Sequence, residues 1–218
     1  MPSIIGQQKL FPTISSIDEI VTEDFLEAAM GAVAIVGSMG SQFSMTRDDM
    51  LGNVKKVRTK YETDKKGLHL LKDLLQNEKA NKEDKNDKSG TVGALWLKRG
   101  LEYLCEVFWE LIQEHVASKQ PGGKSDSGAV KAACKAAYEK TLTKYHNMAS
   151  RMVVKGGLML SPYKETLMTN LAHGEKDKDD EVIEDMKVYE KPLRAYVIVV
   201  CQLFQSFDYK DECLTPQP

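Results

Sequence analysis

The sequence lacks the charge imbalance and the long apolar runs that mark several classes of protein. Its 218 residues include 30 lysines and arginines against 32 aspartates and glutamates, which leaves a net charge of −2. Nucleic-acid binders usually carry a basic excess, so we expect this chain to bind no nucleic acid. The longest apolar run, Ala195–Cys201, is too short to span a bilayer as a helix.

Cysteine motifs are absent as well. Cys105, Cys134, Cys201 and Cys213 lie far apart, with no CxxC pair and no spacing typical of metal ligands. Met1–Gln7 does not open with the positive region and apolar core of a signal peptide. We therefore expect a cytoplasmic protein with reduced thiols and no bound metal.

The sequence also contains no recognisable catalytic motif. It has no Gly-x-Ser-x-Gly elbow and no glycine-rich phosphate-binding loop. Asp49, Lys56 and His146 offer groups for acid–base chemistry, but no nucleophile accompanies them. We expect no catalytic residue, although a helical hydrolase that uses His146 is retained as an alternative.

What is present is helical periodicity, with no alternating strand pattern and no internal repeat. Helices are predicted over Phe25–Val36, Thr46–Tyr61, Leu68–Leu75, Thr91–Ser118, Ala129–Leu160, a short segment from Ser161 and Glu181–Phe207, the last kinked or broken at Pro192. Polar or glycine-rich loops separate them at 77–90, Lys119–Gly128 and His173–Asp180. These loops are too short to divide the chain, so residues 1–218 are predicted to form one all-helical domain.

The predicted helix Thr46–Tyr61 carries two stripes of different character. At 100° per residue its apolar stripe consists of Met50, Val54, Val57 and Tyr61. A second stripe, about a quarter turn away by the same arithmetic, consists of Asp49, Asn53 and Lys56. This stripe is either a solvated edge, with Thr46 and Asp49 forming a capping pair, or a set of donors and acceptors for a polyhydroxylated ligand.

Trp96 and His146 allow the same two interpretations. Trp96 stands one residue before the apolar stripe that begins at Leu97, so its ring is predicted to lie at the edge of the core. A tryptophan there is ordinary boundary packing or a flat face on which a sugar ring stacks. His146, predicted to lie deep in a long helix, is a structural partner of a polar group or a donor to a ligand carbonyl.

Five short segments, in order along the chain, resemble the glycolipid transfer protein family. They are Asp49–Lys56, Leu95–Leu101, Lys144–His146, Pro162–Lys164 and Asp208–Lys210, and they span nearly the whole chain. The resemblance implies a two-layer all-α sandwich of about eight helices that encloses an apolar pocket for lipid chains. It implies a monomeric carrier with no cofactor and no enzymatic activity. Such a carrier takes a glycosphingolipid from one membrane to another and touches membrane surfaces only transiently.

The resemblance also implies a role for each site residue. Trp96 would stack on the first sugar, Asp49, Asn53 and Lys56 would bind its hydroxyls, and Tyr209 would close the headgroup site. Asp49 and His146 would bind the N–H and carbonyl of the ceramide amide, a complementary acceptor and donor. The chain pocket would be drawn from the helix Phe25–Val36 and from Phe43, Val107, Phe108, Leu111, Val153, Val154 and Leu158.

Trp96 and Asn53 favour the branch of the family that carries neutral glycolipids. The alternatives are a ceramide-phosphate carrier or sphingolipid sensor of the same fold, and a helical scaffold without a ligand. Met148 stands where this branch often has a tryptophan, so we expect a weaker membrane anchor there. Val154 replaces a common phenylalanine and is expected to reshape the chain pocket, while Lys98 and Arg99 are expected to attract anionic lipid.

Overall fold

The computed structural model describes residues 1–217, which form eight α-helices and two short 3-10 helices. The α-helices are α1 (Thr22–Ser38), α2 (Ser44–Tyr61), α3 (Leu71–Ala80), α4 (Gly90–Ser118), α5 (Ala129–Thr141), α6 (Met148–Met159), α7 (Lys164–Leu171) and α8 (Asp179–Ser206). The 3-10 helices are η1 (Ile17–Glu19) and η2 (Ser41–Phe43). Within residues 1–217 strand-like pairing is limited to one isolated bridge between Val21 and Leu70. The predicted all-α domain is confirmed.

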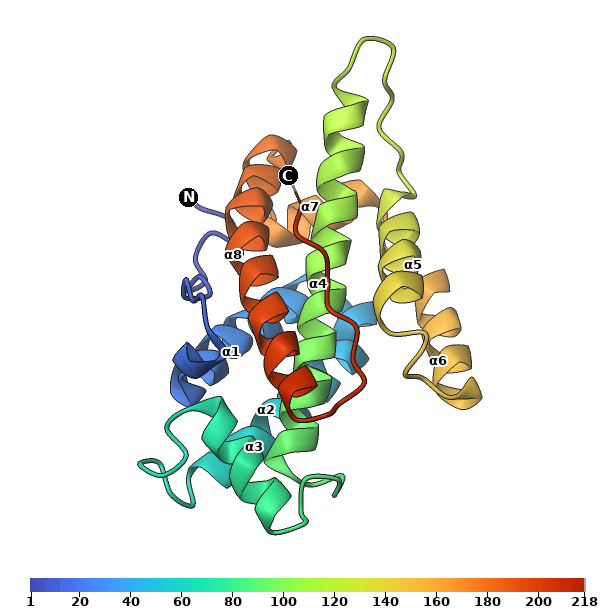
Figure 1. The fold of residues 1–218 in the computed structure, drawn as a ribbon. Coiled ribbons are helices and arrows are strands. Elements are labelled where there is room, and N and C mark those ends of the chain that lie inside the picture. Colours follow the sequence, from blue (N-terminus) through green and yellow to red (C-terminus); the bar gives the residue numbers. More distant parts are fainter. Residues whose placement is uncertain (218) are drawn as a thin grey trace.

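Helix α4 is the centre of the arrangement, with α2, α5 and α8 packed against it (Figure 1). Its predicted apolar stripe is buried along its whole length, from Leu97 to Ile112. The start of α4 is fixed by two acceptors. The Ser89 hydroxyl accepts from the backbone of Val92, and the buried Glu78 carboxylate of α3 accepts from the N–H groups of Gly90 and Thr91. Free N–H groups at a helix start need such partners.

Helix α2 begins two residues before the predicted start. The 3-10 helix η2 runs directly into it, and the residue before its first turn is Phe43, which is buried and makes no side-chain cap. Thr46 therefore lies inside the helix, and the predicted capping pair of Thr46 and Asp49 is wrong. Packing of Phe43 replaces a polar cap at this start, whereas the apolar stripe of α2 is buried as predicted.

The single long helix predicted over Ala129–Leu160 is wrong, because α5 ends at Thr141 and α6 begins at Met148. Two short polar side chains stabilise the break. The Thr143 hydroxyl donates to the carbonyl of Tyr138, and the Asn147 side chain accepts from the N–H of Ser150 to cap α6. Such side chains compete with the helix for backbone partners. His146 consequently lies in the α5–α6 connection and not inside a helix.

Helix α8 continues through Pro192, so the predicted break there is wrong. A proline inside a helix leaves the carbonyl four residues earlier without its N–H partner. That carbonyl belongs to Val188, which is exposed, so the unpaired group lies on the solvent side of α8. Packing of the opposite face, with Tyr189, Leu193 and Tyr196 fully buried, stabilises a continuous helix through the position.

The expectation that all thiols are reduced is wrong in this structure. Cys201 of α8 and Cys213 of the C-terminal segment form a disulfide, and their Cα atoms lie 5.5 Å apart. The spacing of 12 residues did not predict a disulfide, because the two cysteines meet only when the chain turns back along α8 after Ser206. Cys105 and Cys134 are free and buried.

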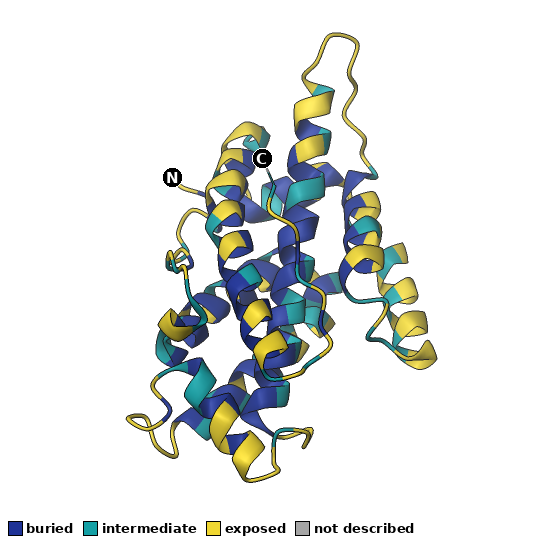
Figure 2. Ribbon diagram, in the orientation of Figure 1, coloured by how far each residue is buried: buried dark blue, intermediate teal, exposed yellow. Residues whose placement is uncertain are grey.

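Helix α6 stands apart from the core at one edge of the molecule (Figure 1). None of its residues is buried, in contrast to the other seven α-helices (Figure 2). None of the helices within residues 1–217 combines the length and the apolar character that crossing a bilayer requires.

Candidate functional site

The candidate site begins where α2 and α4 are in close contact. Gly93 of α4 lies against α2, and a Cβ atom built on it would be 2.9 Å from the carbonyl oxygen of Asn53 and 2.8 Å from Cβ of Lys56. A residue without a side chain allows this approach. Trp96 follows one turn later on α4, on the same side of the helix as Gly93.

The second stripe of α2 forms a continuous chain of hydrogen bonds. The Asn53 amide donates to Asp49 Oδ2 over 3.2 Å, and Lys56 Nζ donates to Asn53 Oδ1 over 3.1 Å. Asn53 is buried, whereas Asp49 and Lys56 keep contact with solvent. Desolvation by the surrounding protein raises the pKa of the Asp49 carboxyl, while Lys56 and His146 oppose that shift. The stripe thus presents acceptors and donors in one row.

His146 is held next to Trp96. The two rings are stacked with centroids 5.7 Å apart and planes 27° apart, and both side chains are half-buried. Burial lowers the pKa of His146, Asp49 opposes this, and Arg99 and Arg151 lower it further, so the ring is neutral at pH 7. The hydroxyl of Tyr138 lies 3.0 Å from His146 Nδ1. When the tyrosine donates, the imidazole proton is on Nε2, which is then a donor.

Tyr209 is engaged elsewhere. Its hydroxyl donates to the side chain of Asp84 over 3.0 Å and to the carbonyl of the same residue over 3.3 Å, and its ring meets Phe204 edge to face. Of the predicted headgroup residues, the contacts above bring Asp49, Asn53 and Lys56 into one row and place Trp96 against His146. Tyr209 is instead bound to the loop between α3 and α4.

The predicted chain-pocket residues divide into two groups. Four of them, Phe43, Val107, Phe108 and Leu111, are packed in the closed hydrophobic core. The other three belong to α6, where Val153 is exposed and Val154 and Leu158 are half-buried.

Between α5 and α6 there is an open groove of about 920 Å³. Among the residues predicted as site residues, His146 and Leu158 line it. Its other walls include Tyr138, Met148, Met152 and Met159, none of which was predicted to bind the lipid. The α5 wall follows helical spacing, with Lys131, Lys135 and Tyr138 on one face.

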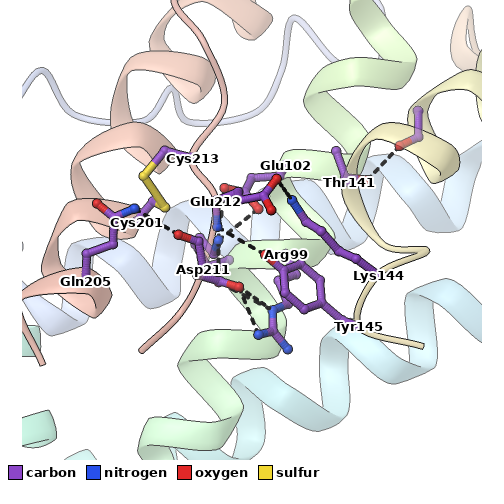
Figure 3. A network of polar contacts seen from close by, with 12 residues as sticks. Arg99, Glu102, Thr141, Lys144, Tyr145, Cys201, Gln205, Asp211, Glu212 and Cys213 are labelled. Atoms are coloured by element: carbon purple, nitrogen blue, oxygen red, sulfur yellow. Dashed lines mark hydrogen bonds and ion pairs between the residues drawn. A yellow bond between two sulfur atoms is a disulfide. The ribbon is translucent and has the colours of Figure 1, made fainter. Parts of the chain in front are cut away.

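Lys98 and Arg99 do not face a lipid surface, so the expectation that they attract anionic lipid is wrong. Lys98 is fully buried and its ammonium contacts Asp211 and Glu102. Arg99 forms hydrogen bonds to Asp211, and its guanidinium lies over the ring of Tyr145 (Figure 3). The guanidinium also lies over the ring of Trp96. Both charges are neutralised inside the fold, and Arg99 contacts the candidate site in a way the sequence alone did not reveal.

The chain is similar to several known proteins. The family model described as "Glycolipid transfer protein (GLTP)" matches residues 20–173. Glycolipid transfer protein A of Xenopus laevis is 28% identical over 211 residues, which cover 93% of this chain and 97% of the relative. A solved structure that describes how FAPP2 selects simple glycosphingolipids with the GLTP fold has a TM-score of 0.74 and 26% identity over 98% of this chain and 96% of its own.

A solved structure of human ceramide-1-phosphate transfer protein with bound ceramide-1-phosphate has a TM-score of 0.73 and 15% identity, covering 94% of both chains. At that identity the likeness shows the fold alone.

Proposed function

Because the chain belongs to the glycolipid transfer protein family, we propose that it binds a glycosphingolipid and transfers it between membranes without covalent chemistry. The observation that carries this proposal is the hydrogen-bonded row of Asp49, Asn53 and Lys56, which lies against Gly93, one turn before Trp96 on α4. Sugar hydroxyls both donate and accept, so a carboxylate, an amide and an ammonium in one row suit them. The Trp96 ring supplies an apolar face for the C–H groups of the sugar.

The ceramide amide would be held by Asp49 and His146. The carboxylate accepts from the amide N–H, and the neutral imidazole donates from Nε2 to the carbonyl. Leaving either amide group unpaired beside apolar surface would cost about 1–3 kcal/mol. Asp49 opposes the lowering of the His146 pKa, and His146 opposes the raising of the Asp49 pKa, so the two groups lie within electrostatic range of each other. This pair would therefore select lipids with an amide linkage.

Helix α6 would provide the transient contact with membranes. Its exposed apolar side chains, Met148, Met152, Val153 and Met159, continue into Leu160 and Tyr163. Arg151 and Lys155 lie among them. Each methylene that enters the bilayer contributes roughly 0.8 kcal/mol, and each cation near anionic lipid about 1 kcal/mol. Membrane attachment would thus be spread over several methionines, and it would not depend on one tryptophan at position 148.

The groove between α5 and α6 would receive part of the lipid chains. It opens beside His146, where the ceramide amide would be held, and its walls carry four apolar side chains of α6, namely Met148, Met152, Leu158 and Met159. Unbranched thioether side chains adapt to ligands of different shape. The predicted pocket around Phe108 stays a proposal for the bound state, because its residues are in contact with one another here.

A ceramide-phosphate carrier is the second candidate, since a protein of that kind has the same fold. A phosphate headgroup needs cations that are free to bind it. Lys98 and Arg99 are committed to Asp211 and Glu102, which leaves Lys56 as the cation of the row. The neutral sugar is therefore the better match.

The test is vesicle-to-vesicle transfer of fluorescent galactosylceramide, with ceramide phosphate and phosphatidylcholine measured beside it. We expect the sugar lipid alone to move quickly, and Trp96→Ala and Asp49→Val to abolish its transfer while helical content is kept. Asp48→Val, the same change at the exposed neighbouring residue, is the matched control. Transfer retained in both site variants would refute the proposal, and movement of ceramide phosphate alone would favour the second candidate. Mass spectrometry of the lipid afterwards should find it unchanged, whereas a released sugar would reveal a hydrolase.

A further inference from the structure

Beyond α8 the chain turns back and runs alongside α4 (Figure 1). We call residues 208–213 the C-terminal strap. Its end is tied to α8 by the disulfide between Cys201 and Cys213 (Figure 3). A second tie is made by the carbonyl of Asp211, which accepts from the side chain of Gln205 over 2.8 Å. The strap is therefore held close to the last turns of α8.

Asp211 anchors this strap through ion pairs with residues of α4. Its side chain is fully buried, and it accepts from Arg99 Nη2 over 2.9 Å and Arg99 Nε over 3.2 Å. Its second oxygen lies 2.6 Å from Lys98 Nζ. Burial opposes ionisation of the Asp211 carboxyl, but hydrogen bonds from Arg99 and the charge of Lys98 lower its pKa below the ordinary value. Asp211 is thus a fixed anion that orients the Arg99 guanidinium.

Arg99 in turn contacts Trp96. The guanidinium carbon lies 3.6 Å from the centroid of the Tyr145 ring and 4.7 Å from that of Trp96. The Tyr145 hydroxyl also accepts from the backbone N–H of Glu212 over 3.1 Å, so the strap fixes both the guanidinium and the ring beneath it. A planar cation held between two rings restricts where the indole can lie.

We propose that the C-terminal strap is a latch that positions Trp96 through Arg99, and that reduction of the disulfide between Cys201 and Cys213 releases it. Arg99 and Asp211 are then positioning residues for sugar binding, a role that rests on the proposed function of Trp96. The chemistry requires a dithiol reductant. Its thiolate attacks Sγ of Cys213, the less buried of the two residues, and Cys201 leaves as a thiolate and takes up a proton. The second thiol then closes the disulfide of the reductant and frees Cys213, which is also protonated.

After reduction, no covalent bond would hold the strap in place, and Asp211 would be kept near Arg99 by noncovalent contacts alone. Until then the disulfide keeps the strap at a high effective concentration beside α4, because the two cysteines are only 12 residues apart in sequence. Loss of a partly exposed cation–π contact changes an equilibrium by about three- to tenfold. We therefore expect reduction to weaken sugar-lipid binding by this factor without unfolding the protein.

The first measurement needs no lipid. In a Trp109→Phe background Trp96 is the remaining tryptophan of the chain, and acrylamide quenching of its fluorescence reports its exposure. We expect dithiothreitol to increase quenching in this protein and to have no effect once Cys213→Ser is added, because the strap is then already open. Equal quenching before and after reduction would overturn the proposal, and so would four reactive thiols in the unreduced, denatured protein instead of two.

The second measurement separates positioning from general stability. Asp211→Asn and Arg99→Lys should raise quenching of Trp96 and weaken galactosylceramide binding under oxidising conditions. Asp208→Asn is the matched control, because it makes the same change on the strap at an exposed side chain. If these variants lose stability in urea but leave Trp96 quenching unchanged, the positioning role is refuted. If oxidised wild type binds no glycolipid while quenching responds to reduction, the latch stands and the proposed function fails.

Discussion

Replacing Gly93 by alanine tests whether the close approach of α2 and α4 builds the site. The new Cβ would lie 2.9 Å from the Asn53 carbonyl oxygen and 2.8 Å from Cβ of Lys56, so backbone must move. Overpacking of this kind typically costs about 1–3 kcal/mol. Against this, alanine gains about 1 kcal/mol over glycine in a helix interior. The net effect on the free energy of unfolding is a loss of up to about 2 kcal/mol.

Gly52→Ala is the matched control, because it lies on α2 and a Cβ there would meet nothing within 4 Å. It gains the same helix propensity without the clash, so the difference between the two variants isolates the cost of overpacking. Gly100→Ala should fall between them, since its Cβ would lie 3.4 Å from the flexible Met50 side chain. Urea unfolding gives the three free energies, and at this chain length each kcal/mol shifts Tm by about 2–4 °C.

The same variant should weaken galactosylceramide binding, because moving α2 from α4 displaces Asn53 and Lys56 relative to Trp96. Two results would contradict this reasoning. One is a Gly93→Ala protein as stable as Gly52→Ala, which would mean that the helices are not in close contact. The other is a destabilised protein with unchanged lipid binding, which would mean that the geometry of the crossing does not define the headgroup site.

Three further predictions concern charge and the membrane surface. Lipid binding should fall as pH drops through the raised pKa of Asp49, above its ordinary 3.8, because protonation removes the acceptor; titrations of Asp49→Asn should show no such step. Burial raises the pKa of Glu102 to about 7 despite Lys98, so the folded state holds the proton of Glu102 more tightly than the unfolded state does. In urea unfolding, wild type should therefore lose stability relative to Glu102→Gln as the pH rises from about 4.5 to 7. Met152→Asp should reduce flotation with anionic vesicles, whereas Val188→Asp, at an exposed position on α8, should not.

The sequence by itself determined the helical class and the row of polar side chains on α2. Both depend on a period of 3.6 residues, which local backbone geometry imposes before any tertiary contact forms. Asp49, Asn53 and Lys56 are three or four residues apart, so any helix there puts them in a row. The segment around Trp96 likewise indicated the family, because such a resemblance is recognised from the order of residues alone.

Only the tertiary structure decided where His146, Tyr209 and the C-terminal cysteines lie. His146 reaches Trp96 because α5 ends early, and that end depends on side-chain bonds from Thr143 and Asn147 that compete closely with helix formation. The pairing of Cys201 with Cys213 and the burial of Lys98 depend on the strap folding back onto α4. Such contacts join residues from different elements, and their free energy arises only when the packed core brings those elements together.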